Sequence, residues 1–414
     1  MTGLLVTGIG VVAPTGVGVE EHWASLVRGE PAIRPVEGFD SGRYGVPLAG
    51  QVRDFVPADH VSPQLMVQTD RWTWMSLAAA TLAAEDAGYT APEDVYATSV
   101  FLASGSGGNE FSQHEIQGLW AKGPRSVGAY QSIAWFYAAS TGQVSIRDGF
   151  KGPSGVVVSE GAGGLDSIGW ARRVARRGTP AVLVGGTEAG LCPYAVLCQA
   201  TGGRLSSAQR PEDAYLPFDR RADGHVVGEG GAILLLEEPG AAAARGATKV
   251  WGEVAGYAAT HDAHHHEDPA PDAVQYARAI RLSLADAGVS PDEVDLVMAD
   301  GAGVPELDRL ELEALGAVFG GRTTPVPVTA PSSFTGRLMA GGSALDVATA
   351  LLAMRDGIVP GTAFLTDPVE APAGVDLVTA GRVRDLSTVV VLARGAGGFN
   401  SSLVLRRPAG GPTS

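Results

Sequence analysis

The sequence has few cysteines, few basic residues and no long apolar segment. Cys192 and Cys198 are the only cysteines among 414 residues, which excludes a disulfide-stapled secreted fold and favours a reducing, cytoplasmic location. Lys and Arg number 30 against 45 Asp and Glu, so the net charge of −15 argues against a nucleic-acid partner or an anionic membrane surface. No uncharged apolar run could span a bilayer. Residues 2–19 lack charge, but their glycines predict a buried strand and turn, not a signal peptide.

What the sequence does contain is an internal repeat. Residues 82–88 read LAAEDAG and residues 282–288 read LSLADAG, and each is followed by a Pro-acid turn and an apolar run. A second pair starts with AGG, at residues 162–166 and 340–346, and each member leads through Leu-Asp into a helix. Each unit of the first pair predicts a helix that stops at a glycine, a capped turn and a buried strand. The chain is therefore predicted to be a duplicated α/β protein.

The repeat divides the chain into an N-terminal half, residues 1–245, and a C-terminal half, residues 246–410. Alternating strands and helices predict mainly parallel sheets that are covered by helices. The run 156–158 is predicted to be a strand that enters a tight turn at 159–164 and then a helix. Helix N-termini at such turns stabilise negative charge, and enzymes place nucleophiles there, but the apex here is Gly161. Taken alone, this segment favours a close-packed turn.

The other glycine-rich and histidine-rich segments do not predict a cofactor. Residues 394–400 lack the Lys and Ser/Thr of a P-loop, and the spacing of Gly8 and Gly10 misses the dinucleotide fingerprint. The His-rich run 261–268 contains zinc-type ligands, but neighbouring loop residues rarely converge on one ion. We expect a solvated loop there, no metal site and no cofactor.

Several segments together resemble the thiolase-fold β-ketoacyl synthases, and most of all the chain-length factors, or ketosynthase β subunits, of aromatic type II polyketide synthases. The segments span nearly the whole chain: 6–10, 132–137, 160–166, 218–231, 300–308 and 397–401. The resemblance implies a thiolase fold of two duplicated α/β halves in five layers, αβαβα. It also implies a subunit of an acyltransferase complex.

The resemblance also implies that the condensing site is lost. Active members use a Cys nucleophile, two His and a Lys, because a reactive thiolate needs nearby positive charge and a developing enolate needs donors. Their positions here hold Gly161, Asp300, Arg337 and Ser332. Chain-length factors commonly carry Gln where this chain has Gly161, and glycine has no side-chain amide to assist decarboxylation. We therefore predict no catalytic residues for condensation, and whether the chain has any activity of its own stays open.

The expected role is to shape a tunnel in a heterodimer with a catalytic ketosynthase α subunit. By resemblance, the growing poly-β-keto chain would pass four residues, Asn109, Ser112, Ile116 and Ile133. The interface is expected at Trp135, Phe136 and Tyr137. Members that make octaketides tend to carry aromatics at several of the four tunnel positions, so we expect a longer product, a decaketide or longer. Bulky Phe111 or Trp120 could instead close the same space.

Two other partner and function hypotheses remain. The acidic acyl carrier protein is expected to dock mainly on the α subunit, because this chain is itself acidic. The arginines at 172, 173, 176 and 177 are expected to be mostly solvated helix surface. The alternative functions are a stand-alone malonyl-carrier-protein decarboxylase or a hydrolase using Ser159 or Glu160, and a free-standing binding protein on the same scaffold.

Overall fold

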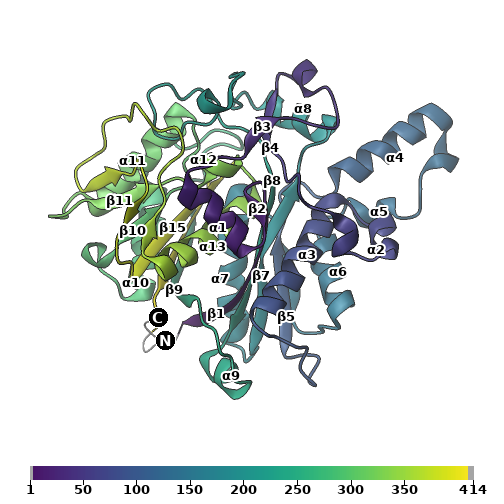
Figure 1. Cartoon of the computed structure of the whole chain (residues 1–414), viewed down its shortest axis with the longest axis horizontal. Coiled ribbons are helices and arrows are strands. Elements are labelled where there is room, and N and C mark those ends of the chain that lie inside the picture. The colour runs from purple at the N-terminus through teal and green to yellow at the C-terminus, as the bar shows by residue number, and fades with distance from the viewer. Residues whose placement is uncertain (1–2, 409–414) are drawn as a thin grey trace.

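Two copies of one strand arrangement form the centre of the protein (Figure 1). The computed structural model describes residues 3–408. Residues 1–2, at the start of the predicted N-terminal half, and residues 409–410, at the end of the predicted C-terminal half, lie outside the described residues. In the N-terminal half the strands are ordered β6-β5-β7-β8-β1, and in the C-terminal half β11-β10-β15-β16-β9, with β13 beyond β11. The matching orders confirm the duplication that the repeats predict.

The described strands and helices have the following bounds. The strands are β1 (Leu4–Ala13), β2 (Gly16–Val17), β3 (Ile33–Pro35), β4 (Leu48–Gly50), β5 (Thr98–Ala103), β6 (Ser154–Val157), β7 (Ala181–Ala189), β8 (Glu229–Glu237), β9 (Gly252–His261), β10 (Leu296–Met298), β11 (Val326–Thr329), β12 (Ile358–Val359), β13 (Val375–Leu377), β14 (Arg382–Val383), β15 (Thr388–Gly395) and β16 (Phe399–Arg406). The α-helices are α1 (Val19–Arg28), α2 (Pro63–Gln68), α3 (Arg71–Asp86), α4 (Asn109–Lys122), α5 (Gln131–Ala134), α6 (Ala139–Asp148), α7 (Gly163–Ala175), α8 (Pro193–Thr201), α9 (Pro239–Ala244), α10 (Val274–Ala287), α11 (Pro305–Phe319), α12 (Ser332–Thr335) and α13 (Ala340–Asp356).

The elements form five layers, as expected. Helices α3 and α6 cover the outer face of the N-terminal strands, and α10 and α11 cover the outer side of the C-terminal strands. Helices α7 and α13, which contain the second repeat pair, pack against each other between the two sets of strands (Figure 1). A Cβ at Gly164 would overlap backbone atoms of Ala340 and Ala344, so glycine there lets the two central helices approach closely.

The strands are less parallel than predicted. The pairs β5–β6, β5–β7, β10–β11, β10–β15 and β11–β13 are parallel, but β1–β8, β7–β8, β9–β16 and β15–β16 are antiparallel. Strands β15 and β16 are joined by the short turn 396–398, and a connection of that length can join only antiparallel strands. The expectation of mainly parallel sheets is therefore wrong. The uncharged N-terminal run forms buried β1 and its turn to β2, as predicted.

The two halves meet through a short strand contact. Strand β1 pairs with β9 over three residues only, which links the N-terminal and C-terminal strands into one 12-stranded sheet within residues 3–408. The connection between β8 and β9 contains α9, and the predicted boundary at residues 245 and 246 stays a prediction. No described helix is long and apolar enough to cross a membrane.

Candidate functional site

The turn at Gly161 has no room for a side chain. Strand β6 leads into a 3-10 turn, Glu160–Ala162, and then into α7, which confirms the predicted strand, turn and helix. Gly161 is buried, and a Cβ built on it would overlap the carbonyl oxygen of Arg394 and lie 3.1 Å from Nη2 of Arg337. Glu160 beside it has a φ of 50°, which is uncommon for a residue other than glycine. The position of a nucleophile is therefore filled by neighbouring groups.

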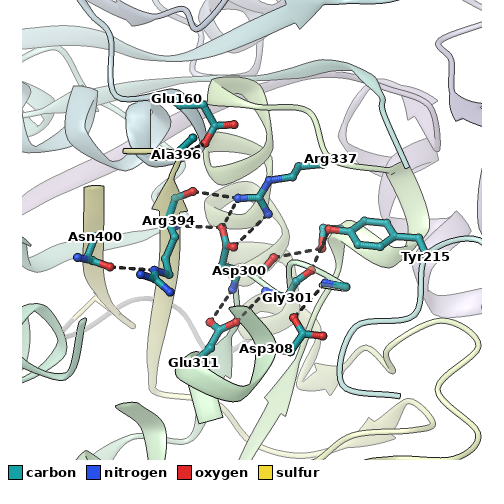
Figure 2. Close-up of polar contacts among 12 residues, drawn as sticks. Glu160, Tyr215, Asp300, Gly301, Asp308, Glu311, Arg337, Arg394, Ala396 and Asn400 are labelled. Atoms are coloured by element: carbon teal, nitrogen blue, oxygen red, sulfur yellow. Dashed lines mark hydrogen bonds and ion pairs between the residues drawn. The ribbon is translucent and has the colours of Figure 1, made fainter. Parts of the chain in front are cut away.

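The neighbour that fills this space is a buried ion pair between Arg337 and Asp300 (Figure 2). Arg337 follows α12 and donates two hydrogen bonds to Asp300, at 3.0 Å and 3.2 Å, and a third, at 2.9 Å, to the carbonyl oxygen of Arg394. The Arg394 amide donates to Asp300 at 3.0 Å. Burial alone would lower the pKa of Arg337, but the charges of Asp300 and Glu160 keep it well above its ordinary value. Arg337 is therefore a fixed cation and cannot act as a general base.

A second carboxyl group fixes the loop that carries Asp300. Glu311 of α11 accepts the amides of Asp300 and Gly301, both at 2.9 Å, and the hydroxyl of Tyr276 at 2.8 Å. Burial, followed by repulsion from Asp300, raises the pKa of Glu311 to about 7. Gly301 has a φ of 52° at this bend. The Glu311 carboxyl group thus fixes the position of the loop that carries Asp300.

Ser332, at the predicted lysine position, makes only neutral contacts. The hydroxyl of Tyr215 donates to the carbonyl oxygen of Gly301 at 2.8 Å and lies 3.2 Å from the Ser332 hydroxyl. Burial raises the pKa of Tyr215 above its ordinary value, so this phenol stays protonated and acts as a donor. Ser332 therefore joins a structural network and offers no charge.

The structure brings all four degenerate positions together. They line one small cavity of about 20 Å³. Asp346 of α13 borders the same cavity, and burial raises its pKa well above its ordinary value. Asp346 was not predicted from the sequence to be a site residue. It is the repeat counterpart of Asp166, and this correspondence could have identified it. Glu311, Tyr215 and Tyr276 gave no comparable signal, because tertiary packing alone brings them to the site.

A larger cavity of about 240 Å³ adjoins the ion pair but does not restore a nucleophile. Cys198, His225 and Arg204 line it together with Asp300 and Arg337. Burial, followed by the charges of Arg337 and Arg204, lowers the pKa of His225 to about 3. An imidazole with this pKa is too weak a base to activate a thiol at neutral pH.

Glu267 of the His-rich segment lines this larger cavity. Arg204 donates at 2.8 Å to the carbonyl oxygen of Glu267, and the His265 ring lies 3.2 Å from Asp268. Among residues 3–408, no group of three or more His, Cys, Asp or Glu side chains is arranged to hold a metal ion.

The predicted tunnel and interface residues form a separate region. Helix α4, with no buried residue, stands out from the body, and α5 lies beside its base (Figure 1). A hydrogen bond of 3.1 Å from Gln131 to the hydroxyl of Ser112 links α4 to α5, which carries Ile133. Large apolar side chains are exposed here: Ile116 by 48%, Ile133 by 39%, Trp135 by 44% and Phe136 by 51%.

The three consecutive aromatics pack against one another. The ring of Trp135 lies 6.2 Å from that of Phe136 and 6.5 Å from that of Tyr137, with edge-on geometry. Exposed apolar clusters of this kind mark interaction surfaces. The four tunnel and three interface residues are thus close in the fold, on a projecting arm formed by residues 109–137, far along the chain from Asp300 and Arg337.

The duplicated five-layer fold defines a protein of the thiolase class, and its turn at the predicted nucleophile position holds Gly161. The chain belongs to the β-ketoacyl synthase family. The model of the beta-ketoacyl synthase N-terminal domain matches residues 1–241, and that of the C-terminal domain matches residues 251–366. The family and the thiolase fold expected from the motifs are confirmed.

Similar proteins point to a particular branch of the family. The chain is 51% identical to the tetracenomycin polyketide synthase ketoacyl synthase beta subunit of Streptomyces glaucescens, over 98% of each chain. It is similar to the ishigamide ketosynthase/chain length factor structure, with a TM-score of 0.89, 29% identity and coverage of 99% and 100%. It also matches a type II polyketide synthase acyl-carrier protein complexed with its ketosynthase bound to the hexaketide, with a TM-score of 0.87, 27% identity and coverage of 98% and 100%. The resemblance to ketosynthase β subunits is confirmed.

Proposed function

We propose that this chain is the non-condensing chain-length factor of an aromatic type II polyketide synthase. It pairs with a catalytic ketosynthase α subunit and sets the number of malonyl-derived units in the product. One observation is the main support for the proposed loss of condensing activity. Gly161 is packed against the Asp300–Arg337 ion pair, in a cavity of about 20 Å³. A covalent acyl-enzyme cannot form at this turn without a nucleophilic side chain.

Two surface features support a heterodimer. The projecting arm exposes Ile116, Ile133, Trp135 and Phe136, which favour burial against a partner. Strand β6 pairs with β5 on one side, and no strand among the described residues pairs with its other side. An open edge strand presents free backbone donors and acceptors to another chain. The α subunit, which would share this fold, could extend the sheet there by a pseudo-twofold axis.

The chain-length role depends on the arm. Asn109, Ser112 and Ile116 lie on one face of α4, and the Ser112–Gln131 bond holds Ile133 nearby. None of the four is aromatic, so the tunnel they would line is deeper than one plugged by aromatics. We therefore propose a product longer than an octaketide. Trp120 is 83% exposed near the far end of α4, and it is the competing candidate for closing this space.

The acyl carrier protein is proposed to dock mainly on the α subunit. Most of the arginine cluster on and just after α7 is exposed, as expected, whereas Arg172 is buried and paired with Asp286. Arg173, Arg176 and Arg177 remain exposed. We propose that the carrier protein uses the α subunit as its main docking site, so the complex does not depend on these arginines for docking.

The test is to express the chain alone and with the α subunit encoded beside it. Both preparations are incubated with malonyl-loaded acyl carrier protein, and the products are weighed by mass spectrometry. The proposal expects polyketide from the pair only, longer than sixteen backbone carbons, that is, more than eight two-carbon units. Condensation by the lone chain would contradict it. Release of carbon dioxide from malonyl carrier protein by the lone chain would instead favour the decarboxylase alternative.

A further inference from the structure

Helix α7 belongs to the central layer and is buried around most of its surface, but it leaves one narrow strip exposed. Its partner α13 is buried along almost its whole length. Gly164, Ile168 and Ala171 lie on the side of α7 that faces α13 and are buried. At 100° per residue, Trp170 and Arg173 fall on the opposite side of the helix. Trp170 is 41% exposed there, and Arg173 is exposed.

The exposed strip is ordered by stacking. The indole of Trp170 lies parallel to the ring of Phe101 on β5, with 5.9 Å between centroids and 2° between planes. The guanidinium of Arg173 lies 4.8 Å from the centre of the Trp170 ring, within the range of a cation–π contact. Among residues 3–408, Arg173 has no ion pair. Its charge is thus oriented by the indole and free to meet a carboxylate from another chain.

This stack adjoins the open edge of the sheet. Phe101 packs beside Gly155 of β6, where a Cβ on the glycine would lie 3.0 Å from the phenyl ring. Val158, immediately after β6, is 52% exposed. The exposed strip of α7 is therefore continuous with the edge at which the proposed function places the α subunit.

We propose that Trp170 and Arg173 form a second contact area with the ketosynthase α subunit and make the pairing selective for that subunit. This inference rests on the proposed function. The α subunit would place an apolar side chain on the free face of Trp170 and a carboxylate on Arg173. A charge pair closed in this way, next to an aromatic anchor, is typical of the residues that dominate binding energy.

The same geometry disfavours pairing of this chain with itself. In a twofold dimer both copies use the same patch, so the three exposed arginines Arg173, Arg176 and Arg177 would be present twice at one interface. Like charges brought together at an interface oppose association. A partner with an acidic group in the same place would not meet this repulsion, so the geometry favours pairing with a different chain over self-association.

The experiment measures the Kd of the purified pair by a titration of labelled subunits. Arg173→Glu and Trp170→Ala are each expected to weaken pairing by about tenfold or more, as loss of a central interface residue does. Arg173→Lys keeps the charge, so its Kd should lie between that of Arg173→Glu and that of the unchanged chain. Arg278→Glu is the matched control, because Arg278 is exposed on α10, in the outer layer over the C-terminal strands, and should leave the Kd within about twofold.

The outcomes separate the inference from the proposed function. Circular dichroism melting of each lone variant first establishes that it folds. If the unchanged chain forms no complex with the α subunit, the proposed function fails. If it pairs, but Arg173→Glu and Trp170→Ala pair equally well, this inference is wrong. It is also overturned if Arg173→Glu leaves the Kd of the pair unchanged and weakens only carrier-protein binding.

Discussion

At the scale of single residues, two of the predicted condensing positions hold a buried structural ion pair. Asp300 and Arg337 occupy positions where, by resemblance, active relatives have histidines, and here they form a bidentate ion pair. Their side chains are only 9% and 14% exposed, so each charge depends on the other for compensation. The pair is therefore a stability determinant of the fold.

Replacing one member of the pair should be costly. Arg337→Met leaves Asp300 buried without its counter-ion, and we expect a loss of about 3–5 kcal/mol in the free energy of unfolding. The double variant Asp300→Asn/Arg337→Met should recover a large part of this loss, since both charges are gone. Urea denaturation of all three chains measures the difference. A single variant as stable as the unchanged chain would show that the pair contributes nothing.

Restoring a thiol at the turn should not restore catalysis. Gly161→Cys places a side chain against the carbonyl oxygen of Arg394, so we expect a loss of about 1–3 kcal/mol in stability. With no histidine at Asp300 or Arg337, the thiol has no general base. Mass spectrometry after incubation with malonyl-loaded carrier protein should find no acyl-enzyme. The variant is made in a Cys198→Ser background, because Cys198 is exposed, and an acyl group on the introduced thiol would contradict the expectation.

At the scale of elements, the arm formed by residues 109–137 is anchored near its base, and the amide of Tyr194 on α8 also donates to Gln113 of α4 at 2.7 Å. Asp70 accepts the amide of Phe111 at 2.8 Å, and Glu188 accepts the hydroxyl of Ser106 at 2.8 Å. Burial raises the pKa of both carboxyls to about 7. Beyond this base α4 makes few contacts with the body, so its outer face is available to a partner.

Aromatic side chains on this face should shorten the product. Asn109→Phe, Ile116→Phe and the double variant fill the proposed tunnel, and we expect loss of one or more two-carbon units from the polyketide made by the pair. His114→Phe adds the same bulk on the opposite side of α4 and should leave the length unchanged. The readout is the product mass. An unchanged mass in the double variant would refute the tunnel assignment.

At the scale of the whole molecule, buried carboxyl groups couple stability to pH. Burial raises the pKa of Asp70, Glu188 and Glu311 to about 7 and that of Asp308 to about 8. Each folded-state pKa is above the ordinary value, so the folded chain binds more protons than the unfolded chain between these values. The stability from these groups is fully present at low pH and is lost as pH rises through 7 and 8.

The melting temperature should therefore fall between pH 6.0 and pH 8.5. The variant Asp70→Asn/Glu188→Gln removes two of the titrating groups, so the decrease in its melting temperature over this pH range should be smaller. Scanning calorimetry at fixed ionic strength measures both chains. A melting temperature that rises over this range would show that the buried carboxyls are ionised in the fold at pH 6.

The sequence predicted the architecture because the signals were local and repeated. The LAAEDAG and LSLADAG segments placed the ends of α3 and α10, and the AGG segments placed the two central helices. Strand direction was not local, so the antiparallel pairs at β8 and β16 were missed. Likewise, the four degenerate positions were located from motifs, but their closure by an ion pair was not.

The amino-acid sequence by itself determined the family and the duplicated fold, and it predicted the absence of a nucleophile, since each depends on which residues stand at which positions. Only the tertiary structure decided what replaced the lost chemistry. Asp300 and Arg337 are 37 residues apart, and Arg394 is 57 residues beyond Arg337. Their contact, like the stack of Phe101, Trp170 and Arg173, depends on packing between distant segments, which residue type and spacing along the chain do not encode.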